Sequence, residues 1–245
     1  QKLEGISYAT ALDLNMGYYT VRLDLSSQKL CTIITPWGKY QYQRLPMGVN
    51  VSPDVFQEKM SELMEGLEFV RTYLDDLLII SSGSFGDHLR QLDTVLSRLR
   101  TAGLKINVEK SAFFAPEIEY LGYLLTKEGI KPVPNKVQAV LDLQHPTTLK
   151  QLRSLLGMVQ FYRDMWQRRS HILAPLTDLV GEGKKKLAWT DIHQKAFDEI
   201  KAVMAKATIL TYPDSTKASE LHTDASHRHL AAVIAGARVL SVRVE

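Results

Sequence analysis

The chain has 245 residues, of which 45% are hydrophobic and 23% charged, so it can form one or two domains of about 100–200 residues and wholesale disorder is excluded. Thirty Lys and Arg against 27 Asp and Glu give a net charge of +3, which by itself indicates no partner. The single cysteine, Cys31, excludes an intrachain disulfide and a cysteine zinc cluster. No apolar run reaches about 18 residues and no signal peptide opens the chain. We therefore expect an intracellular protein, in a cytoplasmic particle or the nucleus, without membrane contact. Because the chain begins with Gln1, we expect an excerpt of a longer product.

The first half of the chain alternates between predicted strands and helices. Short apolar runs predict strands or hairpin arms over residues 11–14, 20–23, 31–35, 39–45, 69–74 and 77–81. Ser52 as N-cap before Pro53 predicts a helix. A second helix is predicted from about Asp87 to Ala102, with Gly103 as its stop and one apolar face formed by Leu89, Leu92, Leu96 and Leu99.

The second half is predicted to be mainly helical. A strand is expected over 119–125, followed by a more open stretch with three prolines up to Pro146. Amphipathic helices are predicted over 148–165 and 190–205, and a strand over 220–223. Strands and helices intermix without regular βαβ alternation, so we predict the α+β class.

Positive charge concentrates between Gln144 and Lys186, where eight basic and three acidic residues give +5, more than the whole chain carries. Such a segment suits a phosphate backbone. A solvated helical face with a flexible lysine tip explains the same pattern equally well.

The feature that most strongly indicates chemistry is Asp75-Asp76, which separates two apolar runs. Adjacent carboxylates on a buried hairpin repel each other, and a divalent cation relieves that repulsion. A polar turn is the alternative, although a two-residue type I′ turn prefers glycine at its second position.

A third carboxylate, Asp13, lies inside the apolar strand Ala11-Leu12-Asp13-Leu14, where aspartate is disfavoured unless something satisfies it. Three carboxylates from buried strands could hold two Mg²⁺ ions about 3.5–4 Å apart for phosphoryl or nucleotidyl transfer. The sequence does not show that Asp13 lies beside Asp75.

Seven motifs in order resemble the reverse transcriptases of gypsy-like LTR retrotransposons. They are Leu12-Asp13-Leu14 with Gly17-Tyr18; Leu45-Pro46-Met47-Gly48 with Ser52-Pro53 and Phe56-Gln57; Tyr73-Leu74-Asp75-Asp76; Gly103-Leu104-Lys105 through Lys110; Tyr120-Leu121-Gly122-Tyr123; Leu152 to Gly157 with Phe161-Tyr162-Arg163 and Ala174 to Leu179; and Leu221 to Ser226. The resemblance implies a right-hand polymerase with an antiparallel palm sheet and a mainly helical thumb. It divides the chain into a palm with truncated fingers (1–125), a thumb (126–185), and a tether with the start of a ribonuclease H domain (186–245).

The resemblance also implies roles for individual residues. Asp13 and Asp75 would bind two Mg²⁺ ions, replaceable by Mn²⁺, with Asp76 supporting the site and Lys110 stabilising pyrophosphate as it leaves. The nucleotide pocket would comprise Leu14, Tyr18, Met47, Gly48 and Tyr73, with Tyr18 excluding a ribose 2′-hydroxyl. The primer and template would contact Tyr120, Leu121, Gly122, Tyr123, Arg153, Gly157 and Phe161.

Structural alternatives remain for several of these residues. Tyr18 and Met47 could fill a core, and Lys110 could be a surface lysine. Residues 120–123 could form a plain hairpin, and Gly157 could permit tight helix packing.

The sequence departs from the family at both ends. Only Lys2 precedes Asp13, so the basic residues that bind the nucleotide triphosphate are missing unless Arg22 and Lys29 replace them. We expect weak or absent polymerase activity from these 245 residues alone. The resemblance makes Asp224 one ligand of a ribonuclease H site, but after Asp224 the only acid is Glu245, so we expect no nuclease activity. His227 and His229 are expected to be surface residues.

We therefore predict a fragment of an RNA-directed DNA polymerase that extends a primer with deoxynucleoside triphosphates. Its expected partners are an RNA/DNA template–primer duplex, a deoxynucleoside triphosphate and, as a further option, a second copy in a homodimer. The alternatives are an inactive remnant that binds nucleic acid through its basic segment, and a protein-interaction module.

Overall fold

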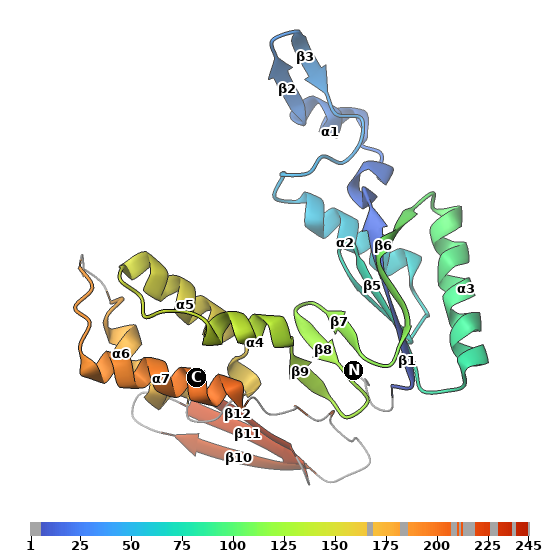
Figure 1. Ribbon diagram of the computed structural model, residues 1–245. Helices are drawn as coiled ribbons and strands as arrows, with labels where there is room; N and C mark the ends of the chain where they lie inside the picture. The colour runs from blue at the N-terminus through green and yellow to red at the C-terminus, as the bar shows by residue number, and fades with distance from the viewer. Residues whose placement is uncertain are drawn as a thin grey trace. The chain divides into compact units, whose positions relative to one another are not determined.

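A computed structural model describes residues 6–165, 169–181, 186–206, 210, 212, 219–225, 230–236 and 239–244. The chain divides into two compact units, one formed by Gly5–Tyr120 and the other containing Leu121–Glu245. Figure 1 labels the elements of both. Among the described residues, no helix is long and apolar enough to cross a membrane.

The N-terminal unit is built on a four-stranded antiparallel sheet in the order β4-β5-β1-β6. Its strands are β1 (Tyr8–Asn15), β4 (Val70–Tyr73), β5 (Asp76–Ser81) and β6 (Lys105–Ala115). Strand β1 lies between β5 and β6, and its register pairs Leu12 with Leu77 and Asp13 with Asp76. A further short strand, β7 (Ile118–Tyr120), ends the unit.

Helices α2 (Ser52–Leu63) and α3 (Phe85–Thr101) supply the core of this unit. Their buried side chains pack with Leu12 and Leu77 of the sheet. Successive side chains of a strand point to opposite faces, so Asp13 and Asp76 belong to the face opposite this core. The arrangement of the two helices beside the sheet is visible in Figure 1.

Both helices were predicted from the sequence, but the N-cap of α2 and the first residue of α3 differ from the prediction. Ser52 is not the N-cap: Val51 occupies that position, and the buried Ser52 hydroxyl donates to the Pro46 carbonyl at 2.7 Å. Helix α3 begins earlier than expected because Ser84 and Asp87 form a capping box. Its buried face carries His88 and Val95 beside Leu92 and Leu99, whereas Leu89 is exposed and Leu96 only partly buried.

An arm of the N-terminal unit carries α1 (Leu25–Leu30) and the hairpin of β2 (Thr32–Thr35) and β3 (Gly38–Gln41). The hairpin was predicted and α1 was not. The strand predicted over 20–23 is wrong, because the 3-10 helix η1 (Gly17–Thr20) occupies its start and Arg22 makes only an isolated bridge with Arg44. The Thr20 hydroxyl donates to the Gly17 carbonyl at 2.6 Å and closes that turn.

The C-terminal unit begins with paired strands β8 (Tyr123–Leu125) and β9 (Ile130–Pro132), and its described residues continue through four helices. These are α4 (Pro134–Leu141), α5 (Leu149–Phe161), α6 (Arg169–Asp178) and α7 (Asp191–Ala205), with the 3-10 helix η2 (Arg163–Met165) after α5. Their shared core includes Leu152, Leu176 and Ile200, each fully buried.

The sequence located α5 and α7 but not α4, which lies in the stretch expected to be open. Proline at its first turn starts α4 instead of preventing it, because the missing N–H is not needed there. Helix α5 ends at Phe161, not Met165, since Tyr162 leaves the helical conformation. The strand predicted over 119–125 is interrupted at Leu121 and Gly122, which adopt φ values of 48° and 81°.

The last elements are three antiparallel strands in the order β10-β11-β12, spanning Ser219–Ala225, Leu230–Gly236 and Val239–Val244. They include the predicted strand over 220–223. His227 and His229 lie outside the described residues.

Candidate active site

Three predicted carboxylates meet where β1 passes the β4–β5 turn. The β1–β5 register places Asp13 opposite Asp76, and the Leu14 amide donates to the Asp75 carbonyl at 2.9 Å. The sequence suggested that Asp75 and Asp76 form the turn together, and this is wrong. Tyr73 pairs with Asp76, so Leu74 and Asp75 make the turn and Asp76 begins β5.

The turn has an unusual backbone that one side chain of α2 holds in place. Leu74 adopts φ 53°, in the left-handed region that costs a non-glycine residue about 1–2 kcal/mol. Its amide donates to Gln57 Oε1 at 2.7 Å, and Gln57 Nε2 donates to Thr72 Oγ1 at 3.1 Å. These bonds fix the turn on both sides of Tyr73.

Burial and mutual repulsion disfavour the charged forms of two of these carboxylates. The pKa of Asp75 is raised by burial and then by the charges of Asp76 and Asp13. The pKa of Asp76 is raised by loss of water around its carboxylate and by the charge of Asp13. In the described part of the chain, no salt bridge joins Asp13, Asp75 or Asp76 to a Lys or Arg.

Asp75 Oδ1 is also buried without a hydrogen-bond partner. An orphaned carboxylate oxygen beside two further carboxylates fits a hard divalent cation. Within the described residues, no group of three or more His, Cys, Asp and Glu side chains is arranged to hold a metal ion. Mg²⁺ does not require such a cage, because it is usually bound by one or two carboxylates together with substrate phosphates and water.

Tyr18 lies next to this carboxylate group. Its ring stacks on Phe56 with centroids 4.9 Å apart, and its pKa is raised by burial and then by the charge of Asp75. A Cβ on Gly17 would lie 2.5 Å from Phe56 Cζ, so glycine is required for Phe56 to reach this position. Tyr18 is half-buried at the edge of the core and not inside it.

The remaining predicted residues of the N-terminal unit differ in exposure. Met47 is 54% exposed, so the core-filling alternative for it is wrong, and Gly48 adopts φ 89° with open space around it. Leu14 is buried, while Tyr73 and Lys110 are exposed. Lys110 lies on β6, on the other side of β1 from β5.

Tyr120 closes the N-terminal unit at β7. Its pKa is raised to about 12, by burial first and then by the negative charge of Asp76. The Tyr120 hydroxyl therefore interacts electrostatically with the Asp76 carboxylate, and it stays protonated at neutral pH.

The other predicted primer and template residues belong to the C-terminal unit. Tyr123 stacks on Phe161 with centroids 5.0 Å apart, and the Tyr123 hydroxyl donates to the Phe161 carbonyl at 2.9 Å. Gly122 lies against Phe161, since a Cβ there would be 2.9 Å from Phe161 Cζ. Leu121 is 40% exposed in the adjoining turn.

Helix α5 presents Arg153, Gly157 and Phe161 on one exposed face, as their spacing predicted. A Cβ on Gly157 would meet nothing within 4 Å, so tight helix packing does not explain this glycine. Strand β10 includes Asp224, whose backbone pairs with Ala231 and whose side chain lies outside the described residues.

Sequence reasoning missed the polar residues that support the carboxylates. Gln57 was noted only as part of a motif, and Ser111, whose hydroxyl oxygen accepts the Asp13 amide at 3.1 Å, was not noted at all. Gln57, Glu58 and Lys59 all lie between the buried Phe56 and Met60 of α2, so polarity alone did not distinguish Gln57.

A four-stranded antiparallel sheet with two helices on one face and carboxylates at a β-turn defines a polymerase-type palm, in agreement with the predicted α+β class. A family model described as reverse transcriptase (RNA-dependent DNA polymerase) matches residues 1–125. A second model, an RNase H-like domain found in reverse transcriptase, matches residues 189–238.

Curated relatives agree with these matches. The Pol polyproteins of transposons opus and gypsy from Drosophila melanogaster are each 31% identical to the chain, over 244 and 240 residues. These alignments cover 95% and 93% of the chain but 24% and 23% of the relatives. The chain thus spans about a quarter of the length of these polyproteins.

Solved structures show the same fold. The foamy viral protease-reverse transcriptase in complex with an RNA/DNA hybrid matches with a TM-score of 0.89 at 24% identity, over 100% of this chain and 34% of that one. A form of that protein in complex with double-stranded DNA matches with a TM-score of 0.87 at 25% identity, over 99% and 43%.

The chain belongs to the reverse transcriptase family. Its similarity to LTR retrotransposon Pol polyproteins confirms the resemblance drawn from the motifs. The division into 1–125, 126–185 and 186–245 stays a prediction.

Proposed function

We propose that this chain carries the nucleotidyl-transfer site of an RNA-directed DNA polymerase encoded in a retrotransposon polyprotein. The observation that carries the proposal is the meeting of Asp13, Asp75 and Asp76, with raised pKa values on two of them and an orphaned Asp75 oxygen. A structural ion-pair network would instead place cations beside these carboxylates, and the described residues contain no such pair.

In the proposed reaction, a primer 3′-hydroxyl attacks the α-phosphate of a deoxynucleoside triphosphate. A bond forms between the 3′-oxygen and the α-phosphorus, the bond from that phosphorus to its bridging oxygen breaks so that pyrophosphate leaves, and the hydroxyl proton passes to solvent. Asp13 and Asp75 would hold two Mg²⁺ or Mn²⁺ ions, and Asp76 would support them. When bound, these cations supply charge stabilisation of the phosphates and lower the pKa of the attacking hydroxyl. The carboxylates themselves contribute the negative charge that concentrates the cations at the β4–β5 turn.

Neighbouring side chains would orient the nucleotide. We assign Tyr18, braced by Phe56, to the sugar, where its ring would exclude a 2′-hydroxyl. Exposed Met47 and Gly48 would meet the base pair, since open space around Gly48 permits close approach. Exposed Tyr73 would flank the same pocket. The Leu14 side chain is buried in the core on the other face of the sheet, so Leu14 would border the pocket only through its backbone. Lys110 would meet the leaving pyrophosphate from β6.

Nucleic acid is the proposed partner of the C-terminal unit. The foamy viral protein of the same fold binds an RNA/DNA hybrid and double-stranded DNA. Arg153, Gly157 and Phe161 share an exposed face of α5, which can approach a duplex closely at Gly157. Tyr120, Leu121, Gly122 and Tyr123 are proposed to position the primer terminus.

The test is primer extension on an RNA template with a DNA primer, Mg²⁺ and four deoxynucleotides. Asp75→Asn is the site variant. Asp93→Asn is the matched control, because Asp93 is an exposed carboxylate on α3 and its substitution removes the same charge as Asp75→Asn does. We expect weak extension or none from these 245 residues, and any extension should disappear in Asp75→Asn and persist in Asp93→Asn.

Extension that survives Asp75→Asn would refute the proposed site. A chain that binds the template–primer in a salt-dependent manner and extends nothing with either Mg²⁺ or Mn²⁺ would favour the second candidate, a nucleic-acid-binding remnant. That candidate is supported by the exposed face of α5. An intracellular location, a homodimer and the absence of nuclease activity stay predictions.

A further inference from the structure

Gln57 lies at a position from which it can control the candidate active site without touching substrate. It projects from α2 to the β4–β5 turn, 17 residues further along the chain. Because a backbone N–H can only donate, the atom that accepts the Leu74 amide at 2.7 Å must be the side-chain oxygen. The amide nitrogen then faces Thr72, whose Oγ1 lies at 3.1 Å and whose carbonyl oxygen lies at 3.4 Å.

The two hydrogen bonds have a consequence for Asp75. Leu74 precedes Asp75 and occupies the left-handed region at φ 53°, a conformation that persists only when the surroundings hold it. On the other side, the Leu14 amide holds the Asp75 carbonyl at 2.9 Å. Asp75 is therefore held between β1 and Gln57.

We propose that Gln57 is a positioning residue for the Asp75 carboxylate: its side-chain amide clamps the Leu74 amide and Thr72, and thereby sets the affinity of the site for divalent cations. This inference rests on the proposed function. Glutamine suits the task because one amide group both accepts and donates, whereas a glutamate would only accept and would add charge beside Asp75.

The test uses the full chain with selectively ¹⁵N-labelled leucine and two measurements that need no polymerase activity. Amide hydrogen exchange of Leu74 reports the hydrogen bond, and Mn²⁺ titration followed by electron paramagnetic resonance reports cation binding. The variant is Gln57→Met, which keeps the length and removes the hydrogen bonds to Leu74 and Thr72, together with the bond that Gln57 Nε2 donates to Ser61 Oγ at 3.1 Å within α2. The matched control is Gln28→Met, since Gln28 in α1 also hydrogen-bonds the backbone, at the Leu23 carbonyl.

We expect Leu74 to exchange about five- to tenfold faster in Gln57→Met, the effect of losing one hydrogen bond. We expect the dissociation constant for Mn²⁺ to rise about tenfold, as it does when an outer-shell partner of a metal ligand is removed. Gln28→Met should change neither quantity. Thr72→Val, which removes only the Oγ1 acceptor, should shift both in the same direction by less and keeps the test decisive if Gln57→Met does not fold.

An unchanged Leu74 exchange rate in Gln57→Met would overturn the inference. Faster exchange with unchanged Mn²⁺ affinity would also overturn it, because Gln57 would then stabilise the turn without positioning Asp75. A wild-type chain that binds Mn²⁺ no better than Asp75→Asn would overturn the metal site of the proposed function instead, so the two failures are distinguishable.

Discussion

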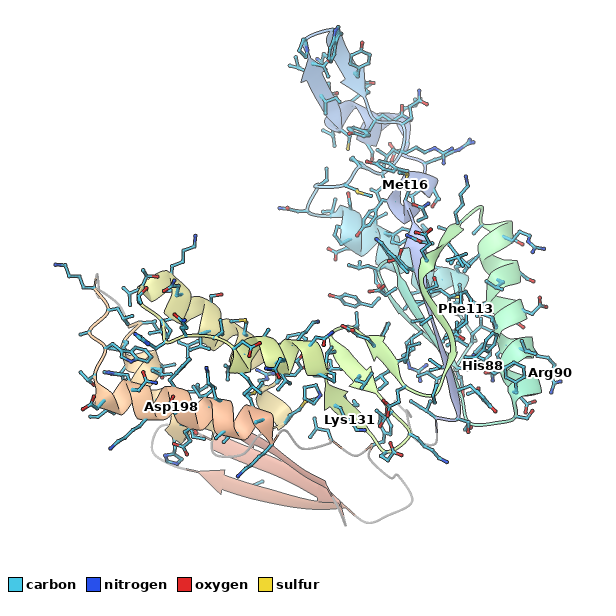
Figure 2. The ribbon with its side chains drawn as sticks, in the orientation of Figure 1. Met16, His88, Arg90, Phe113, Lys131 and Asp198 are labelled. Carbon is cyan, nitrogen blue, oxygen red and sulfur yellow. The ribbon has the colours of Figure 1, made fainter. Side chains whose placement is uncertain are left out.

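The buried imidazole of His88 makes the stability of the N-terminal unit depend on pH. His88 is fully buried, and its side chain reaches from α3 toward the sheet (Figure 2). Its Nε2 lies 2.8 Å from Thr10 Oγ1 and its Nδ1 lies 2.8 Å from Ser81 Oγ. Thr10 Oγ1 already accepts the Phe114 amide at 3.2 Å. A neutral imidazole, with one donor and one acceptor, fits two hydroxyls, whereas an imidazolium would present two donors and a buried charge.

Burial accordingly lowers the pKa of His88 below its ordinary value. A folded state that binds fewer protons than the unfolded state loses stability as the pH falls. The contribution of His88 is complete above the ordinary pKa of about 6.5 and is lost as the pH falls toward the lowered folded value. One proton limits the slope to about 1.4 kcal/mol per pH unit, so we expect a loss of up to about 1.4 kcal/mol between about pH 6.5 and about pH 5.5.

The assay is hydrogen exchange of peptides from α3 and β5 at about pH 7.5 and about pH 5.5, corrected for intrinsic exchange rates. His88→Gln is the informative variant, because an amide can still bond both hydroxyls but does not titrate. Wild type should lose protection at the lower pH and His88→Gln should lose less. The raised pKa values of Asp75 and Asp76 act in the opposite direction and are common to both proteins. Equal losses in the two proteins would refute the assignment to His88.

Three further substitutions test the packing. Gly17→Ala should lower the free energy of unfolding by about 1–3 kcal/mol, because its Cβ would lie 2.5 Å from Phe56 Cζ; a thermal unfolding midpoint equal to wild type would contradict the contact. Thr148→Ala should cost about 1 kcal/mol in urea unfolding, because Thr148 and Gln151 form a capping box at the start of α5, and no loss would show that the cap is dispensable. Leu176→Ala should cost about 2–5 kcal/mol in the same assay, since this side chain is fully buried, and a cost below about 1 kcal/mol would mean that the core collapses around it.

Helices with local signals could be predicted from the sequence, and elements set by longer contacts could not. Thr148 begins α5 as its sequence pattern indicated, and Gly103 follows α3 at φ 72°. Ser52 failed as an N-cap because its hydroxyl bonds the Pro46 carbonyl six residues earlier. The strand expected from Thr20 failed because that side chain closes a turn onto Gly17.

The residues of the candidate site also fall into those that the local sequence reveals and those that depend on distant contacts. Asp75 and Asp76 stand out locally, as a charged pair between apolar runs, and Asp13 stands out as an acid inside a strand. Their meeting depends on the β1–β5 register, which the sequence suggested only through the family resemblance. The role of Gln57 depends on a contact with Leu74, 17 residues away in the chain. Such a contact produces no periodic pattern in the sequence from which it could be predicted.

The pairing of Asp13 with Asp76 makes β1 intolerant of changes in length. Because neighbouring residues of a strand face opposite sides, deleting one residue between Tyr8 and Leu12 forces a choice. Either the residues before the deletion keep their register and Asp13 moves to the face that packs against the helices, or Leu12, Asp13 and Leu14 keep their places and the residues before the deletion change face, which takes Thr10 away from His88. A three-nucleotide deletion preserves the reading frame of a gene, but along this strand it removes either the carboxylate or the packing. Deletions at the solvent-facing tip of the β2–β3 hairpin face no comparable constraint, so inherited copies of this sequence should retain the length of β1 more strictly than that of the hairpin.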